Sequence, residues 1–540
     1  MRSTREGFLI EAREIADFIL PQRYSWLHAN AGKRRRHSLN VRILDNTATR
    51  AVRVLAAGMM AGITSPGRPW FKLKSENPAE SDYWNVVEKR MQTVMAQSNY
   101  YTSKATQYLN MVLFGPAPVI IYQNYEDVIR CYNPCAGEYM IAHDAKQRVD
   151  TLARDFFYTA AQIKGEFTDR TPDKVKVALS RPGGSETNYL IGHLIEPNDQ
   201  PIDGLSAQAV PPHFKYREIY WLMGDTSLLR IKGYEDAPFN CPRWDVIQND
   251  PYGISAAMDA IGDVKQLQKT QLRKAEAIDK QVRPPMMADY WLKDHEADLV
   301  PGGMTFVPSV ANNGGMRPVY TIEPNLENMV ADHEDTRQRI EATFFKDLFM
   351  MISQLDTVRS ATEIDARQQE KLMQLGPVLE RFQSESLDKD IYRIYGIMDR
   401  GGLLPPKPPG MATALPKVKY TSILSQMQQA AGTASIERLY QFAGNLAGIL
   451  PEVLDKFDID DTIDEYAEML GTPPRILLSQ DQVDAKRKAR AQQQQQQTAL
   501  QNSMAAVQGA QTLSQTDVGG GINALQAMVG NQGAGGSQAA

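Results

Sequence analysis

The sequence predicts an α+β fold in which helical segments flank one β-rich region. Apolar residues recur at helical spacing in the first hundred residues and again after about residue 252. Between about residues 115 and 238, aromatic and β-branched residues fill short runs separated by turn residues. A chain of 540 residues is long enough for two to four domains with a sizeable core.

The N-terminal part reads as two helices followed by an aromatic segment. The second helix follows Asp45 or Asn46, either of which can cap it, and ends at the turn 65–67. Trp70 and Phe71 come soon after this turn, and we expect them to anchor the helices onto the β-rich region. The first helix has one apolar face, formed by Phe8, Ala12, Ile15, Ala16 and Ile19.

Two hairpins are predicted in the β-rich region. The run VIIYQNYEDVIRCY (119–132) reads as strand, turn and strand. The run REIYWLMGDTSLLRIKGY (217–234) has the same pattern, with Gly224 and Asp225 at the reversal.

A pair of helices follows the β-rich region. Ser255 can cap the first helix, over 256–282, and prolines directly after it prevent its continuation. A Gly-, Pro- and Asn-rich excursion leads to the second helix, over 325–349, and a loop is expected at 350–360. The apolar residues of the first helix form only a thin stripe, which consists of Ala257, Ile261, Val264, Leu272 and Ala275. A helix with so thin an apolar stripe usually packs against copies of itself or lines a wet surface.

The C-terminal third begins with a capping box, Ser360 and Glu363, that starts a long helix. Gly376–Pro377 predicts a kink within this helix. A further helical module covers about 425–480, and the Gln-, Gly- and Ala-rich residues 481–540 have too little apolar surface to fold alone. Apolar residues of the long helix follow a 3-4-3 spacing with one five-residue step: Leu372, Leu375, Leu379 and Phe382, then Leu387, Ile391, Ile394 and Met398.

Composition and missing motifs argue against several classes of protein. A net charge of −5 argues against a chain that binds nucleic acid over a broad surface. The count of three cysteines argues against a disulfide framework. No apolar run approaches the roughly 18–20 residues of a membrane-spanning helix. The P-loop, dinucleotide-binding, zinc-protease and nucleophile-elbow motifs are missing. We therefore predict a structural protein with no catalytic site, metal or cofactor.

Several reactive or charged groups have ordinary interpretations. Cys131 and Cys135 lack further ligands for zinc and are interpreted as core or loop thiols. His333 is expected at the surface, beside acidic residues. The acidic run 455–466 lacks the ligand spacing of a calcium loop and reads as a helix start. The basic run 32–37 is either a solvated charge run or a contact for phosphate or an acidic partner.

Four stretches carry a further signal, at 42–73, 249–285, 360–406 and 458–477. Together with the Gln-rich tail they resemble the portal, or head-to-tail connecting, proteins of short-tailed, podovirus-like bacteriophages. The resemblance implies a ring of about twelve copies at one vertex of the capsid. Viral DNA would be packaged and ejected through this ring, to which terminase and tail proteins attach.

The resemblance also implies a portal fold with a helical stem, a mixed α/β wing, a clip and a helical crown. The implied divisions are N-terminal helices and β-rich wing (1–255), stem helix 1 (256–282), clip (283–324), stem helix 2 (325–349), tunnel loop (350–360), wing return with the long kinked helix (361–424), crown (425–480), and a disordered or barrel-like tail (481–540).

Three sets of site residues follow from these divisions. Arg359 is the cation of the tunnel loop and would make about one phosphate contact per subunit, unless the loop packs against the wing. The sets are the tunnel loop facing DNA (Met350, Met351, Gln354, Asp356, Thr357, Arg359), the stem helices (Ile261, Val264, Lys265, Lys269, Arg273, Arg337, Ile340) and the clip contact for a partner (Met304, Phe306, Val307, Arg317).

The implied partners are other copies of the chain, double-stranded DNA, terminase, tail adaptor or tube proteins, and major capsid and scaffolding proteins. No membrane is implied. The implied location is the head–tail junction of the virion, and the host cytoplasm during assembly. Two other classes stay open at this point: a DNA-processing enzyme with an unrecognised acidic metal site, and a capsid scaffold or adaptor that binds through its tail.

Overall fold

A computed structural model gives the fold. The chain divides into two units, Met1–Ile449 and Leu450–Ala540. In the second unit the described residues are short helical pieces. The structure describes residues 1–21, 43–74, 80–199, 210–225, 227–288, 290–294, 316–318, 326–354, 373–408, 411, 416–422, 424, 439–445, 462–463, 483, 486–490, 492–496, 504, 507–508 and 511.

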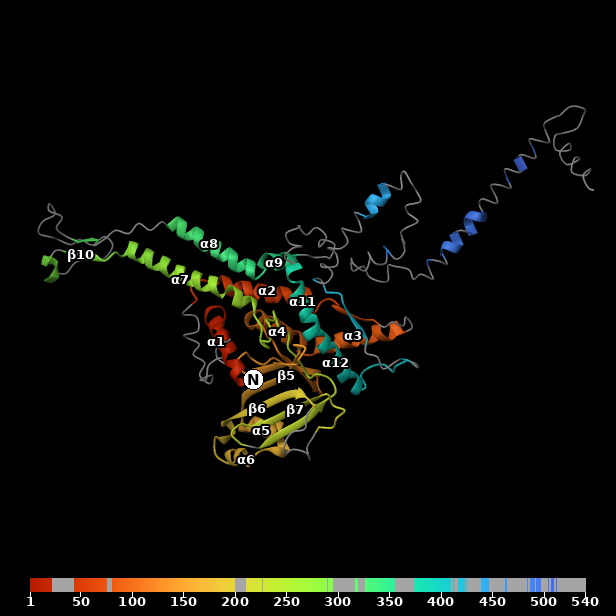
Figure 1. Cartoon of the computed structure of the whole chain (residues 1–540), viewed down its shortest axis with the longest axis horizontal. Coiled ribbons are helices and arrows are strands. Elements are labelled where there is room, and N and C mark those ends of the chain that lie inside the picture. The colour runs from red at the N-terminus through yellow and green to blue at the C-terminus, as the bar shows by residue number, and fades with distance from the viewer. Residues whose placement is uncertain are drawn as a thin grey trace, which may run out of the picture. The chain divides into compact units, whose positions relative to one another are not determined.

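The N-terminal helices form the centre of the first unit (Figure 1). They are α1 (Arg2–Phe18), α2 (Thr47–Ile63), α3 (Ser81–Gln97) and α4 (Tyr100–Phe114). The apolar face predicted for α1 is confirmed, since all five of its residues are buried. Asn46 is the residue that precedes α2, one of the two predicted caps.

Antiparallel sheets follow α4, as the aromatic and β-branched runs predict. A three-stranded sheet has the order β3-β2-β9, and a five-stranded meander has the order β4-β5-β6-β7-β8. Both predicted hairpins are confirmed, one as β2–β3 and the other as β7–β8. The strands are β2 (Val119–Asn124), β3 (Val128–Tyr132), β4 (Tyr139–His143), β5 (Val149–Thr159), β6 (Asn188–Pro197), β7 (Tyr216–Leu222), β8 (Leu228–Tyr234) and β9 (Phe239–Asn240).

Two short helices, α5 (Ala160–Glu166) and α6 (Asp173–Leu179), lie between β5 and β6. They bury Ile163 and Val175 against the sheet residues Phe156 and Ile191, in a core cluster separate from the main one. This mixture of helices and antiparallel sheets confirms the α+β class.

The aromatic segment after α2 has a partner that the sequence did not indicate. Phe71 opens β1 (Phe71–Lys74), which pairs antiparallel with β12 (Lys417–Tyr420) in a ribbon of two strands. The Trp70 ring lies parallel to that of Tyr420, and its Nε1–H donates to the Tyr101 hydroxyl at 3.3 Å. The segment therefore joins α4 to a C-terminal strand, and it lies in the same core cluster as residues of the β-rich region such as Ile120.

The five-residue step in the long helix is a π-helical turn. Gln383–Leu387 is π-helical and joins α11 (Gly376–Phe382) to α12 (Asp388–Arg400). An i to i+5 turn holds one extra residue, so Phe382 and Leu387 both stay on the buried face. The predicted irregularity lies at Gly376–Pro377: residues 373–374 are helical, Leu375 is a turn residue, and α11 starts at Gly376 with the proline in its first turn, where its missing N–H costs nothing.

The predicted helix pair is observed as α7 (Ala256–Val282) and α8 (Leu326–Thr343), which lie side by side (Figure 1). The Ser255 hydroxyl accepts the Met258 N–H, as expected of a cap. Beyond α7, β10 (Met286–Ala288) pairs with β11 (Met316–Pro318), and a 3₁₀ turn covers Tyr290–Asp294. We call α7 and α8 the arm.

Three predictions in this region are wrong. The second helix does not run unbroken to residue 349: it breaks after Thr343, where Phe345 has a φ of 50°, and restarts as α9 (Lys346–Gln354). The loop expected from Met350 is therefore helical through Gln354, because α9 has Asp347 in its first turn and packs Leu348 and Phe349 in the core. His333 is buried rather than at the surface.

Few residues of the C-terminal predictions are described. Residues 439–445 of the expected helical module are helical, and so are residues 486–490 and 492–496 of the tail. Residues 355–372, the acidic run from 455 to 461 and the basic run at 32–37 lie outside the described residues.

Candidate functional site

The arm is the candidate site, because it holds all the predicted stem residues. It is fixed to the body of the first unit by a cluster of Asp45, Gln268 and Arg337, which we call the root. Gln268, from α7, accepts the backbone N–H groups of Leu44 and Asp45 at 2.7 and 2.9 Å and donates to the Asp45 carbonyl at 2.7 Å. A single buried amide thereby ties α7 to the segment that starts α2.

The Asp45 side chain ties α8 to the same point. Nε and Nη2 of Arg337 donate to Oδ2 of Asp45 at 3.0 and 2.7 Å, and the Thr47 N–H donates to Oδ1 at 2.8 Å. Burial alone would raise the pKa of Asp45, but the hydrogen bonds from Thr47 and Arg337 lower it below its usual value. The carboxylate is therefore charged at neutral pH and holds α2 and α8 together.

Apolar residues complete the root. Val264 and Ile340, two of the predicted stem residues, are fully buried, together with Leu267 and Phe344. Ile261 is half-buried against the same core. Three of the seven predicted stem residues thus pack within the subunit itself.

The basic stem residues divide into two kinds. Lys265 pairs with Glu14 of α1, and Arg337 pairs with Asp45, so both have structural partners within the chain. Lys269 and Arg273 are exposed. A cation that the sequence analysis did not single out, Arg339, crosses from α8 to Asp263 of α7 at 3.4 Å.

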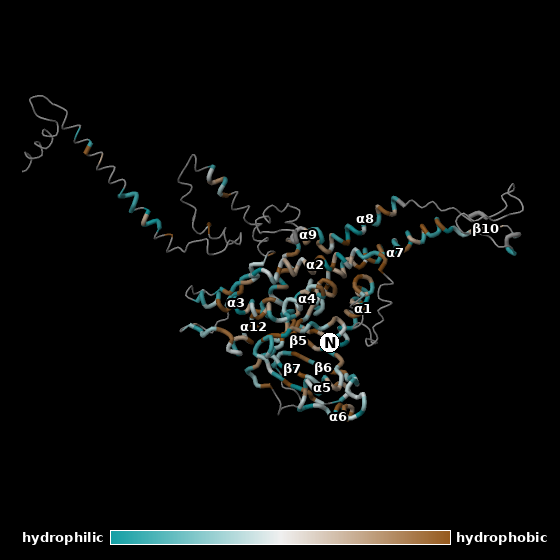
Figure 2. Tube along the Cα trace, turned by 180° about the vertical axis from the view of Figure 1, so that it is seen from behind, coloured by the Kyte–Doolittle hydropathy of each residue, from teal (hydrophilic) through white to brown (hydrophobic). Residues whose placement is uncertain are grey.

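The outer half of α7, residues 272–282, leaves apolar side chains in solvent. Leu272 is 48% exposed, Ile278 38% and Val282 72%. At about 100° per residue, these three side chains span an arc of about 120° around the helix, roughly a third of its circumference. Figure 2 shows apolar segments recurring along α7 as far as its end near β10. The thin stripe predicted for α7 is therefore buried only in its first half.

The helix α9 is seated against α2. Phe349 lies directly over Gly58, so closely that a Cβ at Gly58 would overlap the Phe349 ring. Phe345, at the break between α8 and α9, has the left-handed conformation that glycine favours. The absence of a side chain at Gly58 of α2 therefore makes room for α9.

The remaining predicted site residues are described only in part. Met350 is helical and 44% exposed. Met351 and Gln354 belong to α9, whereas Asp356, Thr357 and Arg359 lie outside the described residues. Arg317 is in β11, opposite Met287. Met304, Phe306 and Val307 of the expected clip are outside the described part of the chain.

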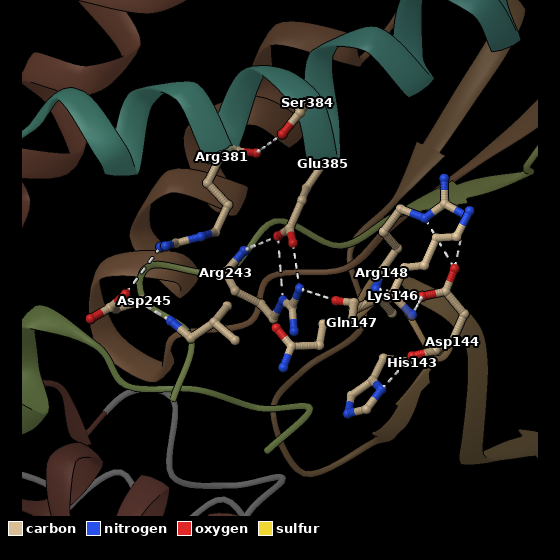
Figure 3. Close-up of polar contacts among 12 residues, drawn as sticks. His143, Asp144, Lys146, Gln147, Arg148, Arg243, Asp245, Arg381, Ser384 and Glu385 are labelled. Carbon is tan, nitrogen blue, oxygen red and sulfur yellow. Dashed lines mark hydrogen bonds and ion pairs between the residues drawn. The ribbon is translucent and has the colours of Figure 1, made fainter. Parts of the chain in front are cut away.

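The segment that leads into α7 is held by the π turn (Figure 3). The backbone N–H of Arg243 donates to Glu385 at 3.0 Å, and its buried guanidinium contacts the same carboxylate and donates to the Gln147 carbonyl at 2.7 Å. Arg381 donates to the Trp244 carbonyl at 2.6 Å and pairs with Asp245. Sequence reasoning missed these contacts, although the five-residue step marked the turn that places Glu385 there.

Among the described residues, a row of polar side chains across the five-stranded sheet most resembles a catalytic cluster. Nε of Arg154 donates to Nδ1 of His193 at 2.6 Å, so the proton of the imidazole is on Nε2 and is donated to Glu218 at 2.9 Å. Burial lowers the pKa of His193 to about 4, and hydrogen bonding to His193 outweighs burial and lowers that of Glu218 to about 2. Tyr220 and Tyr234 also donate to Glu218. His193 and Glu218 are fully buried, so a substrate has no access to them.

Among the described residues, no group of three or more His, Cys, Asp or Glu side chains is placed to hold a metal ion. Within the same part of the chain, no helix has the length and apolar character needed to cross a membrane. Cys131 is buried, and burial raises the pKa of its thiol to about 12.

Comparison with known proteins identifies the family. A family model described as bacteriophage head to tail connecting protein matches residues 1–477. A "Probable portal protein" of Bordetella phage BPP-1 is 40% identical over 526 residues, covering 95% of this chain and 92% of the relative. A "Portal protein" of Salmonella phage epsilon15 is 37% identical over 528 residues, covering 96% and 94%. These relatives are structural proteins, which confirms the prediction that the chain is not an enzyme. The chain belongs to the bacteriophage head-to-tail connecting, or portal, protein family.

Proposed function

We propose that this protein forms a closed ring at one vertex of the phage capsid, through which viral DNA is packaged and later ejected. In this proposal the arm is the stem, residues 283–324 form the clip, the sheets and N-terminal helices form the wing, and residues 425–480 form the crown. The family and the names of both relatives support it.

The observation that carries the proposal is the contrast within the arm. Its root is held by Gln268 and Arg337, whereas Leu272, Ile278 and Val282 of its outer half are exposed along one side of α7. Burying such side chains stabilises an interface by about 25 cal/mol for each Å² removed from water. In a ring each arm would bury this side against the next subunit, through a head-to-tail contact that closes by rotation.

The DNA contact is proposed at the end of α9. Met350, in the middle of α9, is exposed, and beyond this helix the chain continues into the segment that contains Arg359. With about one cation per subunit, the contact would be weak enough for DNA to move. Terminase and tail adaptors would bind the clip, and capsid and scaffolding proteins would contact the wing.

The mass of the purified full-length chain in solution, with negative-stain images of the same sample, tests the proposal. We expect a ring of about a dozen subunits with a central hole. A monomer that persists at high protein concentration would contradict the ring as the default state.

A further inference from the structure

Beyond the root, the two helices of the arm carry opposite charge. The part of α7 after Gln268 has four lysine or arginine residues and two acidic ones, whereas the part of α8 before Thr336 has four acidic residues and no lysine or arginine. The charges are Lys269, Arg273, Lys274, Glu276, Asp279 and Lys280 on α7, and Glu327, Asp332, Glu334 and Asp335 on α8. A helix dipole favours such charges only in the first or last turn, so it accounts for Glu327 and Lys280 but not for the others.

The two helices do not neutralise each other within the subunit. They lie side by side (Figure 1), but Arg339 with Asp263, the ion pair that joins them in the described part of the chain, has its base on α8 and its acid on α7. No described residue forms an ion pair with any of the four cations of α7 beyond the root. Glu334 of α8 contacts Arg337 at 3.4 Å, but its side chain is 58% exposed, and such a pair contributes little stability. The opposite charges therefore remain on the surface of the arm.

Three of the cations gather on one side of α7. At about 100° per residue, Lys269, Arg273 and Lys280 fall within about 40° of one another around the helix. The buried Val264 lies about 140–180° from them, so they face away from the core of the arm. Glu276 lies beside them, and all four of these charged side chains are exposed. We call these four residues the basic flank, since their net charge is positive.

On α8 there is an acidic counterpart. Glu327, Val330 and Glu334 follow one another at intervals of three and four, which makes them neighbours on one side of the helix. All three are exposed, and we call them the acidic flank. Leu272 of α7, which is 48% exposed, lies next to Lys269, three residues before it. Charge and an exposed apolar side chain therefore occur together on both helices.

We propose that the basic flank, together with Leu272, binds the acidic flank of the next copy of the chain. This inference rests on the proposed ring, and it names the surface of the neighbour that covers α7. A head-to-tail contact joins two different patches of the subunit, and rotation repeats it until the ring closes. DNA would attract the basic flank alone, whereas another copy of the chain gives both flanks a partner of opposite charge.

The levels of the residues along the arm support this pairing. Arg339 and Asp263 meet across the two helices, which run in opposite directions, so these two residues lie at the same level (Figure 1). Nine residues farther from the root on each helix are Val330 and Leu272. Because both helices rise by about 1.5 Å per residue, Val330 and Leu272 are again level with each other. Rotation about an axis along the arm keeps every residue at its level, so Leu272 of one copy would face Val330 of the next.

The charges beside this apolar pair match as well. Lys269 and Glu334 both lie nearer the root than the pair, and Arg273 and Glu327 both lie farther from it. At equal levels the contact would therefore form two pairs of opposite charge, one on each side of the apolar pair. Electrostatic complementarity of this kind fixes the register of an interface.

Charge reversal in the full-length protein tests the proposal. K269E/R273E gives the arm two acidic flanks, and E327K/E334K gives it two basic ones. Each variant alone should need about tenfold or more protein to assemble than the wild type, because like charges then face each other at every contact. An equimolar mixture of the two should assemble as the wild type does, since alternating copies restore opposite charges at each contact. Mass in solution over a range of protein concentrations, with negative-stain images, measures assembly.

A matched control reverses the same number of charges elsewhere. Lys146 and Lys164 are exposed in the region of the five-stranded sheet, and K146E/K164E should assemble as the wild type does. The melting temperature of each reversal variant as a monomer guards against misfolding. It should match that of the control, because E334K loses only an exposed contact with Arg337 and the other three changes break no ion pair with a described residue.

Two results would overturn the proposal. One is assembly of both reversal variants at the wild-type protein concentration. The other is a mixture of folded variants that assembles no better than its components. A wild-type chain that forms no ring would contradict the proposed function instead. In that case, association of the two reversal variants with each other but not with themselves would still support the flank contact, and its absence would overturn the contact too.

Discussion

The five-stranded sheet buries charged side chains, whereas the outer half of α7 exposes apolar ones. In the sheet, even the charged residues Arg154 and Glu218 are buried and bonded to partners in the same chain. On α7, apolar residues such as Val282 stay in solvent. Buried polar groups that have hydrogen-bond partners within the chain need no partner from outside. Exposed apolar side chains on a helix, in contrast, are removed from water only when another surface covers them. The comparison separates a region whose polar groups have partners in the same chain from the region that we propose contacts another subunit.

The largest effect is expected where the body of the unit buries charge. Asp390 of α12 is fully buried and pairs with Lys104, and it also accepts the Tyr100 hydroxyl at 2.9 Å. Asp390→Ala would leave the Lys104 ammonium buried without its counter-charge, at a cost of about 3–5 kcal/mol in the free energy of unfolding. Urea unfolding measures this cost. A loss below 1 kcal/mol would show that the contacts of Asp390 with Lys104 and Tyr100 are not needed for stability.

Acidification should weaken the sheet next. The folded-state pKa of His193 is about 4, below its ordinary value of 6.5, so the unfolded state binds more protons between these values. The stability it contributes is complete above about pH 6.5 and is lost as the pH falls towards 4, by on the order of 3 kcal/mol. Glu218 acts in the same direction at lower pH, because its pKa is lowered to about 2.

His193→Gln should flatten this part of the pH profile, because glutamine does not titrate. Denaturant unfolding of both proteins at several pH values between 4 and 7 measures the slope. The same pH dependence in the variant would mean that other groups are responsible.

A smaller effect is expected at the contact between α2 and α9. Gly58→Ala forces Phe349 to move, and overpacking of this kind costs about 1–3 kcal/mol. Gly262→Ala is the matched control, since nothing lies within 4 Å of its added Cβ and alanine favours the helix. Melting temperatures compare the two, and equal values would show that α9 adapts without strain.

The smallest effect on the subunit is expected on the arm. Arg339 pairs with Asp263 of α7 and with Asp335 of its own helix, and these side chains are all a third or more exposed, so Arg339→Ala should cost about 0.2–1 kcal/mol. Added salt should shrink this difference in unfolding free energy. A cost above 2 kcal/mol would indicate that this pair, and not the root, holds α8 on α7.

The elements that local patterns define could be predicted from the sequence. The buried face of α1, both hairpins and the Ser255 cap follow from spacing and turn chemistry within a few residues. The five-residue step after Phe382 marked an irregularity, although its identity as a π turn requires the backbone.

Contacts between distant segments could not be predicted. Asp45 and Arg337 are 292 residues apart, and nothing local indicates that they meet. The helical start of the segment from Met350 was missed because its stability comes from Phe349 packing on Gly58, a tertiary contact. The pairing of β1 with β12 could not be predicted for the same reason, since these strands lie far apart in the chain.

The central claim is that another copy of the chain covers the outer half of α7. The mass of wild-type protein in solution is compared with that of L272S/I278S/V282S and of a control, V86S/V177S/I247S, which changes exposed apolar residues elsewhere in the unit. We predict rings for wild type and control, and monomers with an unchanged melting temperature for the arm variant. Rings of the arm variant as stable as those of wild type would contradict the claim.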